Sequence, residues 1–209
     1  MGAAAVEPED GKRALLVVDV QRDFCEGGAL AVDGGNKIAA RVAELIAACG
    51  EGGRSSYFAV VASRDWHVEP GGHFAAPGKT PDLVTSWPAH CIGGTAGAEL
   101  HPGILGVGFK AVFDKGMKEA AFSAFEGVDA EGTSLGQWLA DSGIEQLDVC
   151  GIATDYCVKA TVLDARQLGF AVRVLLDLCT GVDPRSTAEA VEAMGEAGAV
   201  VVAAATAEP

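Results

Sequence analysis

Six short apolar runs recur along the chain, and stretches with helical spacing separate most of them. The runs cover residues 14–18, 57–62, 111–113, 147–152, 171–176 and 199–202. They are continuous rather than alternating, which is typical of strands buried on both faces of a parallel sheet. Between them, residues 38–46, 158–168 and 187–194 have the pattern of amphipathic helices. The sequence therefore predicts a three-layer α/β fold, in which a six-stranded, mainly parallel sheet carries helices on both faces.

The chain has 209 residues, a length that predicts one domain spanning residues 1–209. We expect residues 1–12 to be flexible. One long connection, residues 68–108, shows little periodicity and is rich in Gly, Pro and polar residues. Connections of this length inside a compact domain are usually functional. Because parallel α/β sheets bind ligands beyond the carboxyl ends of their strands, we expect functional residues just after the apolar runs.

Charge and cysteine content restrict the partners and the location of the protein. A formal net charge of −14 argues against nucleic acid, whose phosphates require clustered Lys and Arg, and against an anionic membrane surface. The longest apolar stretch, residues 198–205, is far below the ~20 residues of a membrane helix. The N-terminus lacks the apolar core of a secretory signal, so the six cysteines are expected to be reduced thiols. We therefore expect a cytoplasmic protein, a monomer or a homodimer, that binds neither nucleic acid nor membranes.

A candidate metal-binding set lies at the second apolar run and in the long connection. Asp65 closes the second predicted strand, and His67 faces the same side because it lies two residues further along extended backbone. His73 and His90 lie in the connection itself. An Asp/His₃ set suits Zn²⁺, Fe²⁺ or Mn²⁺ and leaves positions open for water or substrate. The alternative is that these histidines are solvated, and His101 is expected in a turn.

Three further residues follow apolar runs and could carry catalysis. Asp19 follows the first run, where its carboxylate could act as a general base or only cap a loop. Cys157 lies after a sharp turn at the start of a predicted helix, where the helix dipole favours thiolate and backbone N–H groups could hold an oxyanion. Lys115 follows the third run. A buried apolar role is expected for four other cysteines: Cys25, Cys49, Cys150 and Cys179.

Asp19, Lys115 and Cys157 match the Asp/Lys/Cys triad of the isochorismatase-like cysteine hydrolases. Within that superfamily the chain most resembles the bacterial nicotinamidases/pyrazinamidases, from about residue 14 to about residue 202. The resemblance rests on the order and spacing of several segments rather than on one motif. These segments are residues 17–28, 64–67 with His73, 86–91, 115–116, 125–129 and 151–157.

The resemblance implies roles for the residues of the site. One divalent transition ion per chain, with Zn²⁺ ahead of Fe²⁺ or Mn²⁺, would be held by Asp65, His67, His73 and His90. The peptide between Ile152 and Ala153 would be cis, and the N–H groups of Ala153 and Cys157 would form an oxyanion hole. Four side chains would surround the aromatic ring of the substrate: Phe24, Trp87, Phe122 and Tyr156. Two of these positions vary, because close relatives carry Tyr in place of Phe122 and His also occurs in place of Tyr156.

The implied reaction is hydrolysis of a small carboxamide, nicotinamide, to nicotinate and ammonia in NAD salvage, with pyrazinamide as a second substrate. Asp19 would take the proton of Cys157, Lys115 would stabilise the charges that form, and the thiolate would give a thioester. The pyridine nitrogen would bind the metal ion, which would orient the substrate rather than supply the nucleophile.

Three other functions compete with this hypothesis. Another amidohydrolase or an isochorismatase of the same fold would, if metal-free, lack the Asp/His₃ set. A binding protein on an inactive hydrolase scaffold would lack part of the triad. A nucleotide-binding protein would need a glycine-rich turn, but Gly106 and Gly108 are not followed by a third glycine at the required spacing.

Overall fold

The computed structural model describes residues 11–50 and 57–203, and within them one parallel sheet has the order β3-β2-β1-β4-β5-β6. Its strands are β1 (Lys12–Val18), β2 (Ala59–Asp65), β3 (Ala111–Lys115), β4 (Ile144–Ile152), β5 (Ala171–Thr180) and β6 (Val200–Val202). Each strand overlaps one of the six apolar runs, so the predicted six-stranded parallel sheet is confirmed.

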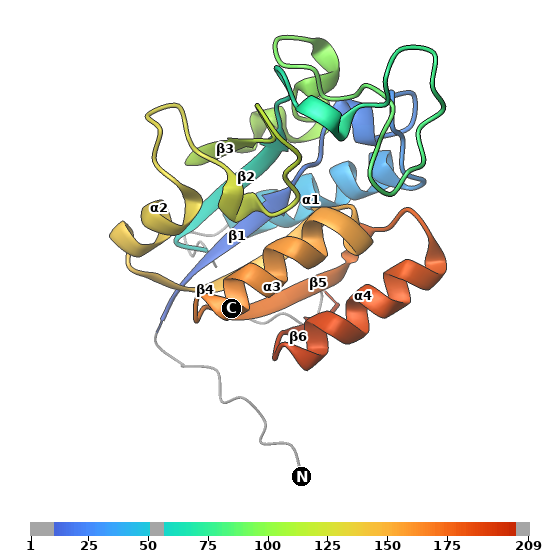
Figure 1. Cartoon of the computed structure of the whole chain (residues 1–209). Coiled ribbons are helices and arrows are strands. Elements are labelled where there is room, and N and C mark those ends of the chain that lie inside the picture. Colours follow the sequence, from blue (N-terminus) through green and yellow to red (C-terminus); the bar gives the residue numbers. More distant parts are fainter. Residues whose placement is uncertain (1–10, 51–56, 204–209) are drawn as a thin grey trace.

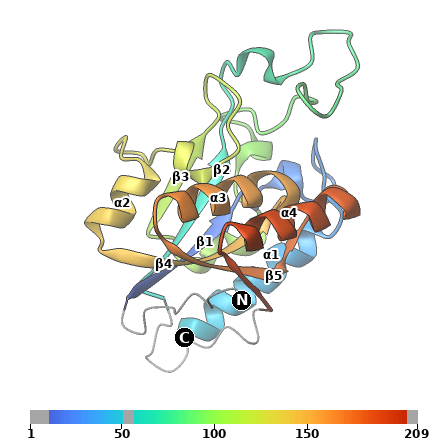
Figure 2. The same ribbon diagram turned by 60° about the horizontal axis from the view of Figure 1, so that its bottom comes forward.

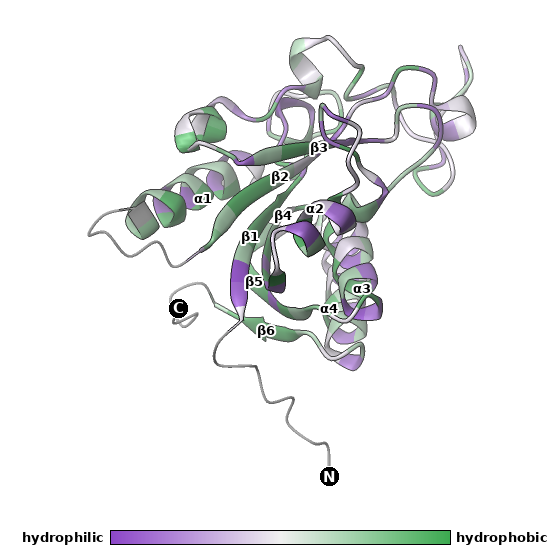
Figure 3. Cartoon of the chain, turned by 90° about the vertical axis from the view of Figure 1, so that its left-hand side faces the viewer, coloured by the Kyte–Doolittle hydropathy of each residue, from purple (hydrophilic) through white to green (hydrophobic). Residues whose placement is uncertain are grey.

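Helices cover both faces of this sheet, as predicted. Helix α1 (Gly35–Gly50) lies on one face, and the other face carries α2 (Leu135–Asp141), α3 (Lys159–Gln167) and α4 (Pro184–Glu196) (Figures 1, 2 and 3). Helix α2 was not predicted, because its seven residues bury only two apolar side chains and are too short to show a period. Short helical turns fill the connections: η1 (Arg22–Phe24), η2 (Gly71–His73), η3 (Ala96–Ala98), η4 (Pro102–Val107), η5 (Ala124–Glu126) and η6 (Thr154–Val158).

Side chains on the two faces of strand β1 pack in two separate hydrophobic cores. Leu15 and Val17 pack in the core that contains the apolar face of α1. Leu16 and Val18 point the other way, into the core built with α2, α3 and α4. Because both faces of β1 are buried from Ala14 to Val18, these five residues are all apolar, and the middle of the sheet is coloured mainly as hydrophobic in Figure 3.

The strand order places a topological switch between β1 and β4. The chain runs from β1 through β2 to β3 at one edge, and from β4 through β5 to β6 at the other. Ligands of such sheets bind at this switch, beyond the carboxyl ends of the strands. The two strands approach closely there, because a Cβ atom on Gly151 would lie 2.0 Å from the carbonyl oxygen of Val18. Glycine is therefore required at this position of β4.

The long connection between β2 and β3 rises above the carboxyl ends of the strands (green in Figures 1 and 2). Between residues 68 and 108 it contains only the short turns η2, η3 and η4. Of the N-terminal segment expected to be flexible, residues 1–10 lie outside the described residues, and Lys12 already begins β1. None of the helices in residues 11–50 and 57–203 has the length and apolar character needed to cross a bilayer.

Candidate active site

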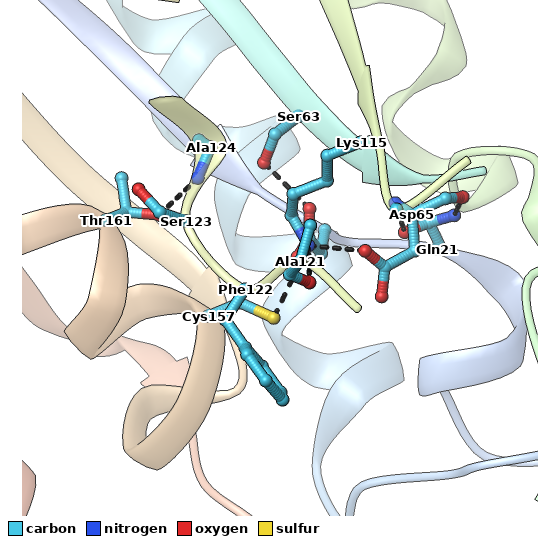
Figure 4. A network of polar contacts seen from close by, with 12 residues as sticks. Gln21, Ser63, Asp65, Lys115, Ala121, Phe122, Ser123, Ala124, Cys157 and Thr161 are labelled. Atoms are coloured by element: carbon cyan, nitrogen blue, oxygen red, sulfur yellow. Dashed lines mark hydrogen bonds and ion pairs between the residues drawn. The ribbon is translucent and has the colours of Figure 1, made fainter. Parts of the chain in front are cut away.

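Three strand ends bring Asp19, Lys115 and Cys157 together. Asp19 directly follows β1, Lys115 ends β3, and Cys157 lies in the turn η6 that follows β4. The Nζ atom of Lys115 lies 2.9 Å from Oδ2 of Asp19 and 3.6 Å from Sγ of Cys157. All three side chains are buried. Figure 4 shows the ammonium group of Lys115 between the sulfur of Cys157 and the carboxylate of Asp65.

Burial and mutual charge set the protonation of this cluster. Burial disfavours the charged form of Lys115, but Asp19 and Asp65 outweigh it and hold the pKa of the ammonium well above its ordinary value. Burial raises the pKa of Asp19, although Lys115 opposes this shift. Burial also raises the pKa of the Cys157 thiol well above its ordinary value, again against Lys115. Lys115 therefore stays protonated at neutral pH, and the Cys157 thiol needs a base to lose its proton.

Asp19 is arranged to be that base. Its Oδ1 atom accepts a hydrogen bond of 2.7 Å from the Ser63 hydroxyl. Its Oδ2 atom is paired in charge with Lys115, and one of the Asp19 carboxylate oxygens lies within 4.8 Å of Sγ of Cys157. The helix N-terminus favours thiolate at Cys157, whereas burial raises the pKa of this thiol well above its ordinary value. Activation of the thiol therefore depends on Asp19 and Lys115.

The three histidines of the predicted metal set lie together and are buried, so the alternative of solvated loop histidines is wrong. One ring nitrogen from each of His67, His73 and His90 lies within 4.8 Å of the others. The Oδ2 atom of Asp65 lies 3.7 Å from Nε2 of His67 and 3.9 Å from Nε2 of His90. His101 lies outside this cluster, where its ring accepts the N–H of Gly103 at the start of η4.

The protonation of the histidine rings fits a metal ion. The Nδ1 atoms of His67 and His90 lie 2.7 Å from the carbonyl oxygens of Gly116 and Pro88. A carbonyl only accepts, so both Nδ1 atoms carry the proton and both Nε2 atoms keep a free lone pair. The Nε2 atom of His67 is buried without a hydrogen-bond partner among the described residues. Such an orphaned acceptor beside a carboxylate fits the donor set of a divalent transition ion.

Electrostatics favour the neutral form of His73 and His90. Burial lowers the pKa of His73 to about 4. Burial also lowers the pKa of His90. Lys115 outweighs the burial of Asp65 and holds the pKa of its carboxyl below the usual range. At neutral pH Asp65 is therefore ionised and the rings of His73 and His90 are neutral, which are the forms that bind metal.

Two backbone positions accommodate this arrangement. Gly116 adopts φ +72°, and a Cβ atom there would lie 2.7 Å from the ring of His67. Glycine therefore lets the chain turn after Lys115 and bring its carbonyl to His67. The peptide bond between Ile152 and Ala153 is cis, the isomer that the resemblance implies.

A cavity of about 110 Å³ opens beside Cys157. It is lined by the predicted oxyanion residues Ala153 and Cys157 and by the four predicted ring contacts: Phe24, Trp87, Phe122 and Tyr156. Asp65, His73 and His90 reach its wall from the histidine cluster. The ring of Tyr156 lies edge-on to Trp87, with centroids 5.1 Å apart, and stacks on Phe122, with centroids 6.2 Å and planes 29° apart. The site can therefore enclose a small aromatic ring next to a nucleophile.

The turn that carries Phe122 is fixed by polar contacts. The N–H of Ala124 donates to the Thr161 hydroxyl of α3 at 2.9 Å (Figure 4). Glu126 accepts the N–H groups of Phe122 and Ser123 at 3.0 and 2.8 Å. These contacts hold the aromatic wall against the helix that follows Cys157.

Sequence reasoning missed the residues that orient the site. Gln21 contacts Asp65, Ser63 contacts Asp19, and both side chains are fully buried. Asp155, two residues before Cys157, is also almost completely buried. A polar residue next to a predicted catalytic residue was the available signal, as with Gln21 after Asp19. That signal does not reveal the partner, which comes from a distant strand or loop.

Comparison with known protein families places the chain. The family model described as the isochorismatase domain matches residues 13–206. The chain belongs to the isochorismatase family. It is 47% identical over 190 residues to the nicotinamidase/pyrazinamidase of Mycobacterium tuberculosis. The aligned region covers 91% of this chain and 98% of that protein.

Solved structures of this family have the same fold. A nicotinamidase/pyrazinamidase from Acinetobacter baumannii superposes with a TM-score of 0.80 at 34% identity, over 95% of this chain and 99% of that one. A pyrazinamidase from Pyrococcus horikoshii, in complex with zinc, gives a TM-score of 0.76 at 38% identity, over 92% and 99%. Both similarities cover more than nine-tenths of the chain.

Proposed function

We infer that this protein is a nicotinamidase, which hydrolyses nicotinamide to nicotinate and ammonia for NAD salvage. The observation that carries this conclusion is the buried cluster of Asp19, Lys115 and Cys157, which opens on an apolar cavity beside an Asp/His₃ set. The cavity is lined mainly by aromatic and aliphatic side chains, which suits a flat heteroaromatic ring. The identity to the Mycobacterium tuberculosis enzyme along nearly its whole length supports the same activity.

The residues of the cluster divide the chemistry among them. Asp19 takes the thiol proton, and the thiolate of Cys157 attacks the carboxamide carbon. Lys115 stabilises the negative charges, and the N–H groups of Ala153 and Cys157 hold the oxyanion. The proton on Asp19 passes to the departing amine, so that ammonia leaves and a thioester remains. Asp19 then deprotonates water, which attacks the thioester and releases nicotinate and the thiol.

Asp65, His67, His73 and His90 would hold one divalent ion, with Zn²⁺ ahead of Fe²⁺ or Mn²⁺. A bound ion would offer a coordination position to the pyridine nitrogen of the substrate. The support for this assignment is the orphaned Nε2 atom of His67 and the shared orientation of the rings. The related pyrazinamidase from Pyrococcus horikoshii was solved in complex with zinc, which favours that metal here.

Competing functions have less support. The strand order matches that of dinucleotide-binding folds, but fold alone does not determine function. The carboxyl end of β1 carries Asp19 and Gln21 instead of a glycine-rich turn. An inactive scaffold would have no reason to keep a complete and buried triad. We propose pyrazinamide as a second substrate, because it differs from nicotinamide by one ring nitrogen.

We propose a cytoplasmic location, because all six cysteines are free thiols. We also propose one domain over residues 1–209 and a monomer or homodimer, which light scattering would distinguish.

Ammonia release from a panel of small amides tests the proposed activity. Purified protein should turn over nicotinamide fastest, with pyrazinamide also a substrate and aliphatic amides nearly inert. Turnover of an aliphatic amide at a higher rate than nicotinamide would reject the assignment and favour another amidohydrolase.

A further inference from the structure

The turn that carries Cys157 is tied to a distant loop by one buried carboxylate. Asp155 lies in η6, two residues before Cys157, and its side chain is nearly inaccessible. Its Oδ1 atom accepts the N–H of Val182 at 3.0 Å. Its Oδ2 atom accepts the N–H of Asp183 at 3.2 Å and the hydroxyl of Ser186 at 2.6 Å. All three donors belong to the connection between β5 and α4 or to the first turn of α4.

Both ends of this tie reach the substrate cavity. Cys157 and Tyr156 line the cavity from the η6 side, and Val182 lines it from the opposite connection. Asp155 therefore joins the turn that carries the nucleophile to a wall of the cavity. The tie is tight, because a Cβ atom on Gly181 would lie 3.2 Å from Oδ1 of Asp155 and 1.9 Å from the hydroxyl of Thr187.

The helix does not need Asp155 for its own cap. Asp183 is the N-cap of α4, and its side chain accepts the N–H groups of Arg185 and Ser186 at 2.9 and 3.1 Å. The Asp155 carboxylate instead accepts hydrogen bonds from donors that lie 27 to 31 residues further along the chain. Displacement of this carboxylate would leave it and its three donors buried without hydrogen-bond partners, which is unfavourable.

We propose that Asp155 is a positioning residue, which holds the Cys157 turn and the Val182 wall in one fixed relation for catalysis. This proposal rests on the proposed nicotinamidase activity. Asp155 touches neither the substrate cavity nor the histidine cluster and takes no proton in the reaction. Its effect on the rate arises because displacement of a reacting atom by about 1 Å can cost a hundredfold in turnover.

Graded variants separate positioning from folding. Asp155→Ala leaves all three donors without an acceptor. Asp155→Asn keeps one carbonyl oxygen for Val182, and the Ser186 hydroxyl can rotate to accept from the new amide. Ser186→Ala removes a single hydrogen bond. Asp183→Ala is the matched control, because it removes the cap of the same helix but leaves the backbone N–H that Asp155 binds.

The experiment measures kcat and KM for nicotinamide, together with the rate of Cys157 alkylation by iodoacetamide, followed by peptide mass spectrometry. All variants are assayed as full chains well below their melting temperatures. For Asp155→Ala we expect kcat/KM to fall by about a hundredfold, with a raised KM and an altered alkylation rate. Asp155→Asn and Ser186→Ala should fall between this variant and the wild type. Asp183→Ala should melt earlier yet keep wild-type kinetics.

Equal kinetics and equal alkylation in Asp155→Ala and Asp183→Ala would overturn the proposal. If Asp155→Ala does not fold, unchanged values in both Asp155→Asn and Ser186→Ala would overturn it instead. A wild-type protein without activity on nicotinamide would refute the proposed function, whereas the alkylation rates would still test the positioning role.

Discussion

The side-chain amide of Gln21 holds both polar groups of the Asp65 backbone: its Oε1 atom accepts the Asp65 N–H at 2.8 Å, and its Nε2 atom donates to the Asp65 carbonyl at 2.8 Å. The same Nε2 atom donates to the carbonyl of Ala98 at 2.8 Å. Gln21 is fully buried, two residues after Asp19. It therefore orients the carboxylate that lies between Lys115 and the histidines.

Replacing this amide should weaken metal binding. Because outer partners of metal ligands typically contribute 10–100-fold to affinity, we expect Gln21→Ala to lower zinc affinity by about that factor. Gln21→Glu keeps the acceptor for the Asp65 N–H but turns a second oxygen toward the carbonyls of Asp65 and Ala98, so it should also lower the affinity. Competition with a chromogenic chelator measures the affinity. Gln137→Ala, which removes an exposed amide on α2, is the control, and equal affinity in the Gln21 and Gln137 variants would contradict the account.

Asp19→Asn should be almost as damaging as loss of the thiol, because the amide cannot take the proton of Cys157. Residues that act as one unit are not additive. The double variant Asp19→Asn/Cys157→Ala should therefore be little worse than either single variant in steady-state kcat. Fully multiplicative losses would indicate independent roles.

Lys115→Met should also lose most activity, because Asp19 and Asp65 would then face each other without a cation.

Removal of the metal ion should act mainly on substrates that can bind it. Benzamide keeps the ring size and the carboxamide of nicotinamide but has no pyridine nitrogen. It should be a much poorer substrate for the metal-loaded protein, and the gap should shrink after chelation. His67→Ala or His90→Ala should lower metal content, measured by elemental analysis, from about one ion per chain. A nicotinamide rate that chelation leaves untouched would show that no ion orients the substrate.

A buried charge cluster at the other end of the sheet should affect stability alone. Asp148 in β4 is fully buried and accepts hydrogen bonds from three side chains: Arg13, Tyr57 and Arg173. Asp148→Ala removes the buried carboxylate that faces Arg13 and Arg173, so we expect a loss of about 3–5 kcal/mol in the free energy of unfolding. Urea denaturation measures this loss. Glu189→Ala, which breaks an exposed ion pair with Arg185, should change stability little.

The sequence predicts the strands and the ends where Asp19, Lys115 and Cys157 lie, because parallel strands share one carboxyl edge. It also predicts the histidine cluster, since Asp65 and His67 are neighbours at that edge. The burial of Cys157 is not readable from its own segment, because the enclosing residues come from other strands and loops. The partners of Gln21 and Asp155 lie 27 to 77 residues away, and no local pattern specifies such contacts.

Nicotinate formation by matched cysteine variants tests whether Cys157 is the nucleophile. Initial rates are measured for the wild type, Cys157→Ala, Cys91→Ala and Cys150→Ala, all with equal metal content. We expect Cys157→Ala to lose activity by on the order of a thousandfold or more, while the Cys91 and Cys150 variants retain substantial turnover. Nicotinate formation by Cys157→Ala at near the wild-type rate would show that Cys157 is not the nucleophile.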